Sequence, residues 1–552
     1  MRAGIEGRLF DKRGRFAHPV AESHGSSLES QDRPSLLRLW SDRLPMLRIL
    51  GHPKRLCDGI SRRDLLHVGG AGMLGLGLNG LLEAKSVQSG LPIARSARNA
   101  DLSSSFGRAK HCILLFLYGS PSQLETFDMK PDAPLEIRGT MKPIASSVPG
   151  LDVVEHLPRV AEIMDRTTVV RSVTHPYPIH GVAFATTGVQ TIDAGMELSP
   201  TDPRHQPYFG SALEYLLRRR GSLSPNTVDN VFLPFPFSSQ RTDQPLRAGP
   251  YASYLGAAYH PKWTEFVGEG TKVVDKVRPG FSFHGKEPYL GCTPQSYFRM
   301  SDTAVLPGMT LNRFDRRRTL LEQIDFGRRD LEQSLAGKPL TRFQQTAFSM
   351  LASPTISTAL DVRGEAPATR AQYGMTLFGQ SCLAARRLIE AGTRLVSVFW
   401  DEYGLAGDAW DTHFDHFPRM ITQLLPPFDL AYSGLILDLE RRGLLDETLV
   451  VCISEHGRTP KLATNVKGGG RDHWSQAYSA IFAGGGIARG RVVGATDRCA
   501  AEVKDRPVSP KDLLATMYHL LGVDPHTRLS DRTSRPVGLV PDDAEVVAEM
   551  LA

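Results

Sequence analysis

Six stretches of the chain are almost continuous runs of apolar residues, rich in Val, Ile and Leu, and each has the length of a β-strand. They do not alternate between apolar and polar positions. Such runs are typical of strands in a parallel sheet that is covered on both faces. The predicted strands are residues 111–118, 167–173, 230–235, 393–400, 448–454 and 478–483.

Longer segments with helical spacing of apolar residues separate most of these runs. The predicted helices are residues 208–220, 316–335, 342–351, 373–391, 420–442 and 510–521. The alternation of strands and helices predicts an α/β fold, a three-layer α/β/α sandwich with a central, mostly parallel sheet. We expect one such domain over residues 101–552. Residues 223–307 are rich in Pro and Gly, and we expect them to form an irregular insertion over one face of the sheet.

The first 100 residues form an N-terminal extension that contains an export motif. Arg62 and Arg63 follow Ser61 and precede a Gly-rich apolar core at residues 68–78. This arrangement is that of a twin-arginine signal. The core is too short and too rich in Gly for a stable membrane span, which needs about 20 strongly apolar residues. The motif predicts the twin-arginine translocase as a partner and a periplasmic or extracellular location.

Met46 begins a short segment, residues 46–50, that would form a compact region ahead of the arginine pair. Residues 1–45 are rich in Arg and Ser and lack clear periodicity. We therefore expect translation to begin at Met46 rather than at Met1.

The distribution of charge argues against a nucleic-acid partner. The net charge is +6, but the first 100 residues hold 16 Lys and Arg against 9 Asp and Glu, and the remaining residues hold 49 against 50. The basic character belongs to the export segment, and the predicted domain is nearly neutral. A polyphosphate partner requires a basic surface on the domain itself.

Three segments in the last third of the chain, residues 410–416, 454–460 and 468–474, each place a carboxylate close to an imidazole. Two of them follow predicted strands, where ligands bind in open α/β sheets. Carboxylate and imidazole suit a divalent metal, which can polarise a phosphate or sulfate ester. Alternatively, each His caps a turn or pairs with a carboxylate for structural reasons. The predicted ligands, for zinc or manganese, are Asp411, His413, Glu455, His456, Asp472 and His473.

Two earlier loops offer further candidates. His175 and His180 follow the predicted strand 167–173. Each could be a metal ligand, an acid–base group or a polar loop residue. Glu125 and Asp128 follow the first strand, and either could complete a metal site or lie in solvent.

Five motifs, taken in order, resemble the exported proteins of the domain-of-unknown-function 1501 family. They are residues 111–132, 171–172, 410–413, 455–460 and 470–474, and the similarity extends from the arginine pair to about Gly522. This family is similar to the alkaline phosphatase superfamily, which includes sulfatases and phosphodiesterases. The resemblance implies an alkaline-phosphatase-like fold. It also implies that Asp411 and His413 form the Asp/His pair of metal ligands, Glu455 and His456 the adjacent Asp-His, and His473 the last ligand.

The chain departs from the superfamily pattern at the nucleophile. When residues 187–188 are aligned with the Thr-Gly that ends the sulfatase signature, Pro178 falls at the nucleophile position. Thr174 is the nearest plausible hydroxyl, and a metal-activated water would remove the need for one. Glu455 also stands where the superfamily has Asp, and relatives often have Phe in place of His456.

Two functions follow as expectations. The first is an exported metal-dependent hydrolase of phosphate or sulfate esters that acts on a small anionic substrate. In it, Arg458 or Arg471 clamps the anion, His180 assists proton transfer, and Thr174 is the candidate nucleophile. The second is a non-catalytic protein of the same fold that binds a ligand or an exported partner.

Overall fold

The computed structural model describes residues 98–189, 194–200, 202–223, 228–278, 280–301 and 354–552, which all belong to one compact unit, Arg95–Ala552. The export motif, Met46 and the predicted helices 316–335 and 342–351 lie outside these residues. None of the helices in the described part of the chain is long and apolar enough to cross a membrane.

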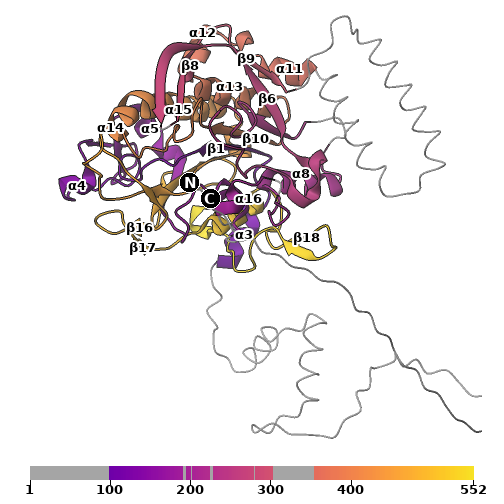
Figure 1. The fold of residues 1–552 in the computed structure, drawn as a ribbon. Helices are drawn as coiled ribbons and strands as arrows, with labels where there is room; N and C mark the ends of the chain where they lie inside the picture. Colours follow the sequence, from indigo (N-terminus) through magenta and orange to yellow (C-terminus); the bar gives the residue numbers. More distant parts are fainter. Residues whose placement is uncertain (1–97, 190–193, 201, 224–227, 279, 302–353) are drawn as a thin grey trace, which may run out of the picture. The chain divides into compact units, whose positions relative to one another are not determined.

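A nine-stranded sheet forms the centre of the protein, in the order β15-β4-β14-β11-β1-β10-β5-β6-β9 (Figure 1). Five of its eight neighbouring pairs are parallel, and the antiparallel pairs involve β14 or β9. The predicted mostly parallel sheet is therefore confirmed. The strands are β1 (His111–Leu117), β4 (Thr167–Val173), β5 (Asn230–Leu233), β6 (Lys262–Val267), β9 (Tyr297–Met300), β10 (Leu395–Trp400), β11 (Thr448–Ile453), β14 (Tyr478–Ala483) and β15 (Arg491–Val493).

All six predicted strands are present in this sheet because their apolar runs are buried on both faces. In β10 and β11 every residue is buried, and in β1 only His111 is partly exposed. A strand that buries both faces removes all of its apolar area from water, which explains why these runs lack the alternation of a half-exposed strand.

Two groups of helices cover the sheet. Figure 1 shows α13 (Leu377–Glu390) and α15 (Leu425–Arg441) on one side of the strands, and α8 (Phe209–Arg219) and α16 (Pro510–Leu520) on the other. Helices α13 and α15 pack on each other, and the rings of Phe209 and Tyr518 join α8 to α16 at a centroid distance of 5.2 Å. The three-layer α/β/α arrangement is thus confirmed.

The predicted helix 373–391 begins later than expected, at Leu377. The side chain of Thr376 accepts a hydrogen bond from the backbone of Gly379 and caps the helix, and Gly374 has a positive φ of 84° that a helix does not allow. The remaining helices are α3 (Arg98–Ser105), α4 (Leu135–Arg138), α5 (Pro158–Glu162), α6 (Val182–Thr187), α7 (Ala194–Glu197), α11 (Pro354–Leu360), α12 (Pro367–Gln372) and α14 (His416–Arg419).

The segment 223–307, expected to be irregular, contains several strands. Strands β5, β6 and β9 extend the edge of the sheet, and β7 (Gly270–Arg278) pairs with β8 (Phe281–Cys292) in a long antiparallel hairpin. The two hairpin strands carry many charged and exposed residues. Their sequences therefore lack the continuous apolar run that marks the central strands. Their sequence pattern is therefore weak. The other short strands are β2 (Pro143–Ala145), β3 (Asp152–Val154), β12 (Gly457–Arg458), β13 (His473–Trp474), β16 (Ala495–Thr496), β17 (Val503–Asp505), β18 (Arg528–Ser530) and β19 (Pro536–Gly538).

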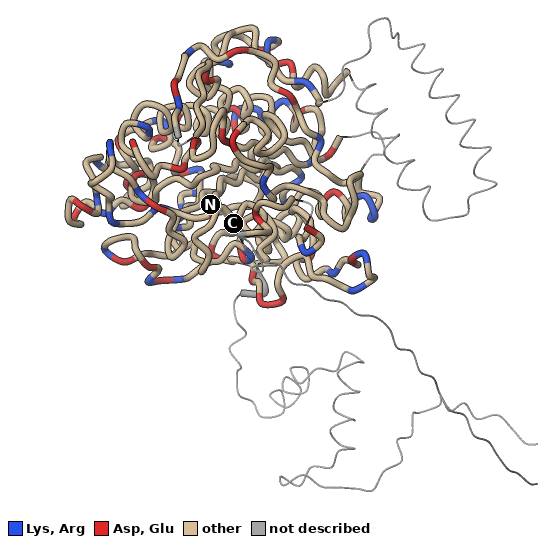
Figure 2. The backbone as a smooth tube through the Cα atoms, viewed as in Figure 1, with Lys and Arg blue, Asp and Glu red and all other residues tan. Residues whose placement is uncertain are grey.

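Charged side chains are distributed evenly over the described residues. Figure 2 shows basic and acidic positions interspersed along the backbone, without a long stretch of one sign. This agrees with the near-neutral charge that the sequence gives for residues 101–552.

Candidate functional site

The predicted site residues lie where the central parallel strands end. Residues 118–120 follow β1, residues 401–413 follow β10, and residues 454–458 follow β11, so neighbouring parallel strands deliver their polar loops to one edge. Ligands of open α/β sheets bind at this edge. The loop that leaves β4 brings His180 to the same place, and residues 471–473 complete the group.

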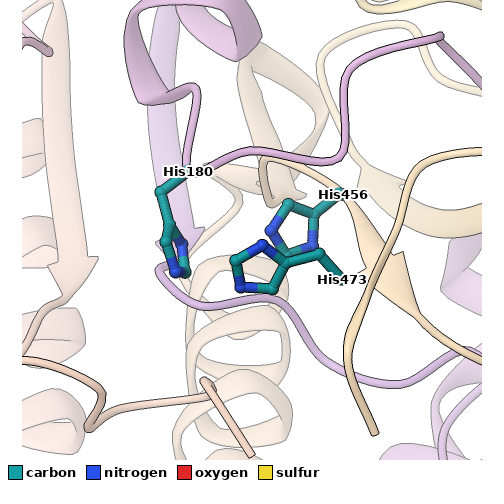
Figure 3. Close-up of side chains that lie close together, drawn as sticks. All are labelled: His180, His456 and His473. Atoms are coloured by element: carbon teal, nitrogen blue, oxygen red, sulfur yellow. The ribbon is translucent and has the colours of Figure 1, made fainter. Parts of the chain in front are cut away.

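Three histidines form the first cluster. Potential ligand atoms of His180, His456 and His473 all lie within 4.8 Å of one another. Figure 3 shows their rings grouped together. The ring centroid of His473 is 4.3 Å from that of His180 and 4.4 Å from that of His456. These side chains are close enough to share one ion.

Backbone carbonyls fix the tautomers of two of these histidines. Nδ1 of His456 lies 2.8 Å from the carbonyl oxygen of Gly457, and Nδ1 of His473 lies 3.2 Å from that of Pro178. A carbonyl oxygen only accepts, so each Nδ1 carries the proton and each neutral ring keeps its lone pair on Nε2. The Nε2 atom of His456 is buried and has no hydrogen-bond partner among the described residues. Burial, together with the nearby His473 and Arg458, holds the pKa of His456 well below its usual value.

The second cluster shares His473 with the first. It contains Asp411, His413 and His473, whose ligand atoms again lie within 4.8 Å of one another. Oδ1 of Asp411 lies 3.1 Å from Nε2 of His413 and 3.3 Å from Nε2 of His473. Asp472 lies at the exposed rim, outside the cluster, where its carboxylate accepts a hydrogen bond from Nδ1 of His413 at 2.6 Å.

Glu455 contacts His180 and belongs to neither cluster. Its Oε1 accepts hydrogen bonds from Nδ1 of His180 at 3.0 Å and from the backbone of Gly119 at 2.8 Å. The other side of the His180 ring faces Asp411, with Nε2 3.3 Å from Oδ2. Burial alone would lower the pKa of His180, but Asp411 and Glu455 outweigh it and raise the pKa to about 9. The two carboxylates therefore favour the protonated form of His180.

Arg458 is fully buried and joins the loops of the site. Its guanidinium donates to Oδ1 of Asp411 at 2.6 Å, to the carbonyls of Ser120 and Arg471, each at 3.2 Å, and to the carbonyl of Gly119. Burial would raise the pKa of Asp411, but Arg458 and His180 hold it well below its usual value. The donors of Arg458 are directed at protein groups, so the structure offers no support for the expected anion clamp.

Gly119 allows this close packing. Its φ of 88° lies in the region that favours glycine, and a Cβ atom there would collide with the backbone nitrogen of Asp411. The loop after β1 and the loop after β10 therefore approach more closely than any other residue at position 119 would permit.

A buried carboxylate on the first loop connects the two segments that carry the second cluster. Glu125 forms an ion pair with Arg471 and lies 3.3 Å from Nε2 of His416. Burial alone would raise its pKa, but Arg471 and His416 lower it to about 2. Arg471 is thereby engaged and buried, and it too is unavailable as the expected clamp. Asp128 forms an ion pair with Lys130 and, like Glu125, lies in neither cluster.

Thr174 does not contact the clusters. Its backbone nitrogen donates to the carbonyl of Val508, and none of the hydrogen bonds of the described residues joins its hydroxyl to the site. Sequence reasoning missed Tyr118 and Arg247. The ring of Tyr118 stacks on that of His180 at a centroid distance of 5.1 Å, and the guanidinium of Arg247 lies over the ring of Tyr118, 5.6 Å from its centroid. Tyr118 directly follows β1, and this position at the end of a central strand is the sequence signal that could have identified it as a site residue.

These features define an α/β protein with a histidine–carboxylate cluster at the carboxyl edge of its central sheet. A family model described as "Protein of unknown function (DUF1501)" matches residues 109–551, and the chain therefore belongs to the DUF1501 family. No curated protein matches the sequence.

Among solved structures, the chain is similar to the PsFucS1 sulfatase from Pseudoalteromonas sp., with 10% identity and a TM-score of 0.35 over 78% of this chain and 72% of that chain. The lipoteichoic acid synthase LtaP from Listeria monocytogenes has 12% identity and a TM-score of 0.31 over 81% and 78%. The phosphonate monoester hydrolase of Agrobacterium radiobacter has 13% identity and a TM-score of 0.32 over 80% and 77%. Similarity at this level assigns no substrate or mechanism.

The geometry around Arg458 predicts a large loss of stability when its charge is removed. In Arg458→Met, Asp411 stays buried without its main counter-charge, and we expect the free energy of unfolding to fall by about 3–5 kcal/mol. Chemical denaturation followed by circular dichroism measures this change. Arg498→Met is the matched control, because Arg498 is exposed and should change stability by less than about 0.5 kcal/mol. Equal effects of the two substitutions would contradict the role given to Arg458.

Proposed function

We propose that this protein is an exported, metal-dependent hydrolase of phosphate or sulfate esters, with its metal held by Asp411, His413, His456 and His473 and with His180 beside it. The observation that carries the proposal is the buried, unpartnered Nε2 of His456, directed at two other histidines. Burying a polar atom without a partner costs free energy, so such an atom in a group of potential ligands favours a bound ion.

The donor set fits zinc or manganese. Asp411, His413 and His473 offer one carboxylate and two imidazoles, and His456 adds a third imidazole with its lone pair directed inward. Imidazole and carboxylate are ordinary ligands of these ions. When bound, the ion would supply Lewis-acid polarisation of an ester oxygen and acidification of a water molecule.

The remaining predicted residues have supporting roles in this proposal. Asp472 holds the ring of His413, and Glu455 holds the ring of His180, as carboxylates commonly do beside metal-binding histidines. His180, whose protonated form Asp411 and Glu455 favour, is the group we assign to proton donation toward the leaving oxygen. Because Thr174 has no contact with the clusters, we assign the attack to water. Arg458 fixes Asp411 and supports the site without touching the substrate.

Binding without turnover is a second candidate. It is favoured because the hydroxyl of Thr174, the candidate nucleophile, has no hydrogen bond to either cluster among the described residues. In this case the same edge of the sheet would hold a ligand or an exported partner.

Metal analysis tests the site directly. We expect purified protein to hold at least one zinc or manganese ion per chain by inductively coupled plasma mass spectrometry, and His456→Ala and His473→Ala to lose it. Asp472→Asn should weaken metal affinity by about 10–100-fold, because it releases the ring of His413. His526→Ala is the control, since His526 is exposed and distant in sequence from every ligand. Less than one ion per chain, unchanged by these substitutions, would refute the proposal.

Turnover separates the two candidate functions. We expect the metal-loaded protein to hydrolyse at least one of 4-nitrophenyl phosphate, bis(4-nitrophenyl) phosphate and 4-nitrophenyl sulfate, and His180→Gln to lower kcat, because the proton donor is lost. Absorbance of released nitrophenolate gives the rate. Bound metal without hydrolysis of any of these esters would instead favour the binding protein.

The proposed location depends on Arg62 and Arg63. Replacing both by Lys should abolish export, because the translocase reads the arginine pair itself. Immunoblots of cytoplasmic and exported fractions measure the outcome. Export that persists in the double variant would show that another route carries the protein.

A further inference from the structure

A cavity of about 1000 Å³ adjoins the second cluster, and Asp411 and His413 lie in its lining. Its walls come from the β7–β8 hairpin, the loop after β10, and the segment that contains α14. The volume is at the upper end of the range for small-molecule sites. An ester group held at the cluster must project the rest of the substrate into adjoining space, and this cavity provides that space.

Most basic side chains of the cavity are already paired. Lys276, from β7, lies 2.5 Å from Glu287 and also pairs with Asp408. Arg419 lies 3.3 Å from Asp408 and donates to the carbonyl of Asp411 at 2.9 Å. Arg247 pairs with Glu197. These pairs retain N–H groups and oxygen lone pairs for hydrogen bonds, but their charges are compensated.

The two charged residues of the lining without an ion pair among the described contacts have opposite signs. They are Lys467 and Asp415, and they are neighbours, because the backbone of Asp415 donates to the carbonyl of Lys467 at 2.8 Å. A second anionic group in the cavity would therefore meet at least as many carboxylates as cations. The lining contains four basic residues, Arg247, Lys276, Arg419 and Lys467, and five carboxylates, Asp275, Glu287, Asp408, Asp411 and Asp415.

Apolar side chains complete the lining at the surface. Val277 is 77% exposed and Phe414 is 49% exposed, and both line the cavity. An exposed aromatic ring offers a flat surface to C–H groups, and the paired charges beside it offer partners to hydroxyls. A sugar combines these two properties without a charge of its own.

We propose that the cavity binds an uncharged sugar that carries a single ester group, and that it discriminates against substrates with a second anionic group. This proposal rests on the proposed function, in which the ester group binds at the metal site. The balanced charges of the lining and its exposed aromatic ring carry the assignment.

The kinetic test uses matched esters. With the metal-loaded full chain, kcat/KM for glucose 6-phosphate, or for glucose 6-sulfate if the protein is a sulfatase, should exceed that for the corresponding glucose 1,6-bis-ester by roughly tenfold or more, because the paired cations offer no free counter-charge to a second anionic group that loses its water. Val277→Lys adds a cation at an exposed position of the hairpin and should reduce this ratio. Equal rates, or a preference for the bis-ester, would overturn the proposal.

An equilibrium test does not depend on turnover. Methyl glucoside should bind the full chain in isothermal titration calorimetry, and Phe414→Ala should weaken binding roughly tenfold while metal content is unchanged. Ile421→Ala is the control, because Ile421 is also an exposed apolar residue but does not line the cavity. Absence of glucoside binding would overturn the sugar assignment even if nitrophenyl esters are hydrolysed. Conversely, glucoside binding without hydrolysis of any ester would leave the sugar site in place and refute the hydrolase.

Discussion

The buried guanidinium of Arg458 is the interaction on which the arrangement of the site depends. Arg458 lies in the short strand β12, and its guanidinium binds groups from the loop after β1, the loop after β10 and the segment ahead of β13. Burying a guanidinium and a carboxylate costs several kcal/mol for each ion, which only good geometry and additional hydrogen bonds offset. The carbonyls around Arg458 supply those bonds. Because the donors of Arg458 are held by these carbonyls, its guanidinium fixes the carboxylate of Asp411 at a defined point of the cluster.

A second buried ion pair, between Glu125 and Arg471, also connects segments of the site. Glu125 holds Arg471, and the backbone of Arg471 donates to the carbonyl of Thr412. The side chain of Thr412 in turn contacts Nδ1 of His416 at 2.7 Å, and His416 also faces Glu125. The segment that carries His413 and the segment that carries His473 are therefore tied together through side chains that do not enter the cluster. Such support keeps ligand atoms in place before any ion binds.

How much of this could be predicted from the sequence differs between the fold and the site. The six central strands were predictable because each is an apolar run buried on both faces. The β7–β8 hairpin was not, since Lys272, Lys276 and Lys286 interrupt its apolar residues and only pairing with the other strand defines it. The position of a strand end indicated which loops meet, and Asp411, His413, His456 and His473 do meet. It did not indicate which atoms face one another.

The roles of the nearby carboxylates illustrate that limit. Glu455 and Asp472 each precede a histidine of the cluster, and sequence spacing alone made them equal to Asp411 as ligands. In the structure, the backbone directs Glu455 toward His180 and Gly119, and Asp472 toward His413 at the rim. Adjacent residues in an extended loop point in opposite directions, so a carboxylate next to an inward histidine tends to face away from it. His180 reaches the same edge because β4, which is distant in sequence from β11, is separated from it in the sheet only by β14.

The charge balance of the protein bears on how an anionic substrate would be selected. Basic and acidic positions are interspersed along the described backbone, and the lining of the cavity beside the cluster contains four basic residues and five carboxylates. Long-range attraction therefore contributes little, and the attraction for an ester must act over a few ångströms, at the cluster itself. An anion site that acts only at short range does not weaken the binding of a substrate whose remaining part is uncharged. Selection of that remainder then falls to hydrogen bonds with paired charges and to contact with Phe414, which act on shape and hydroxyl position rather than on charge.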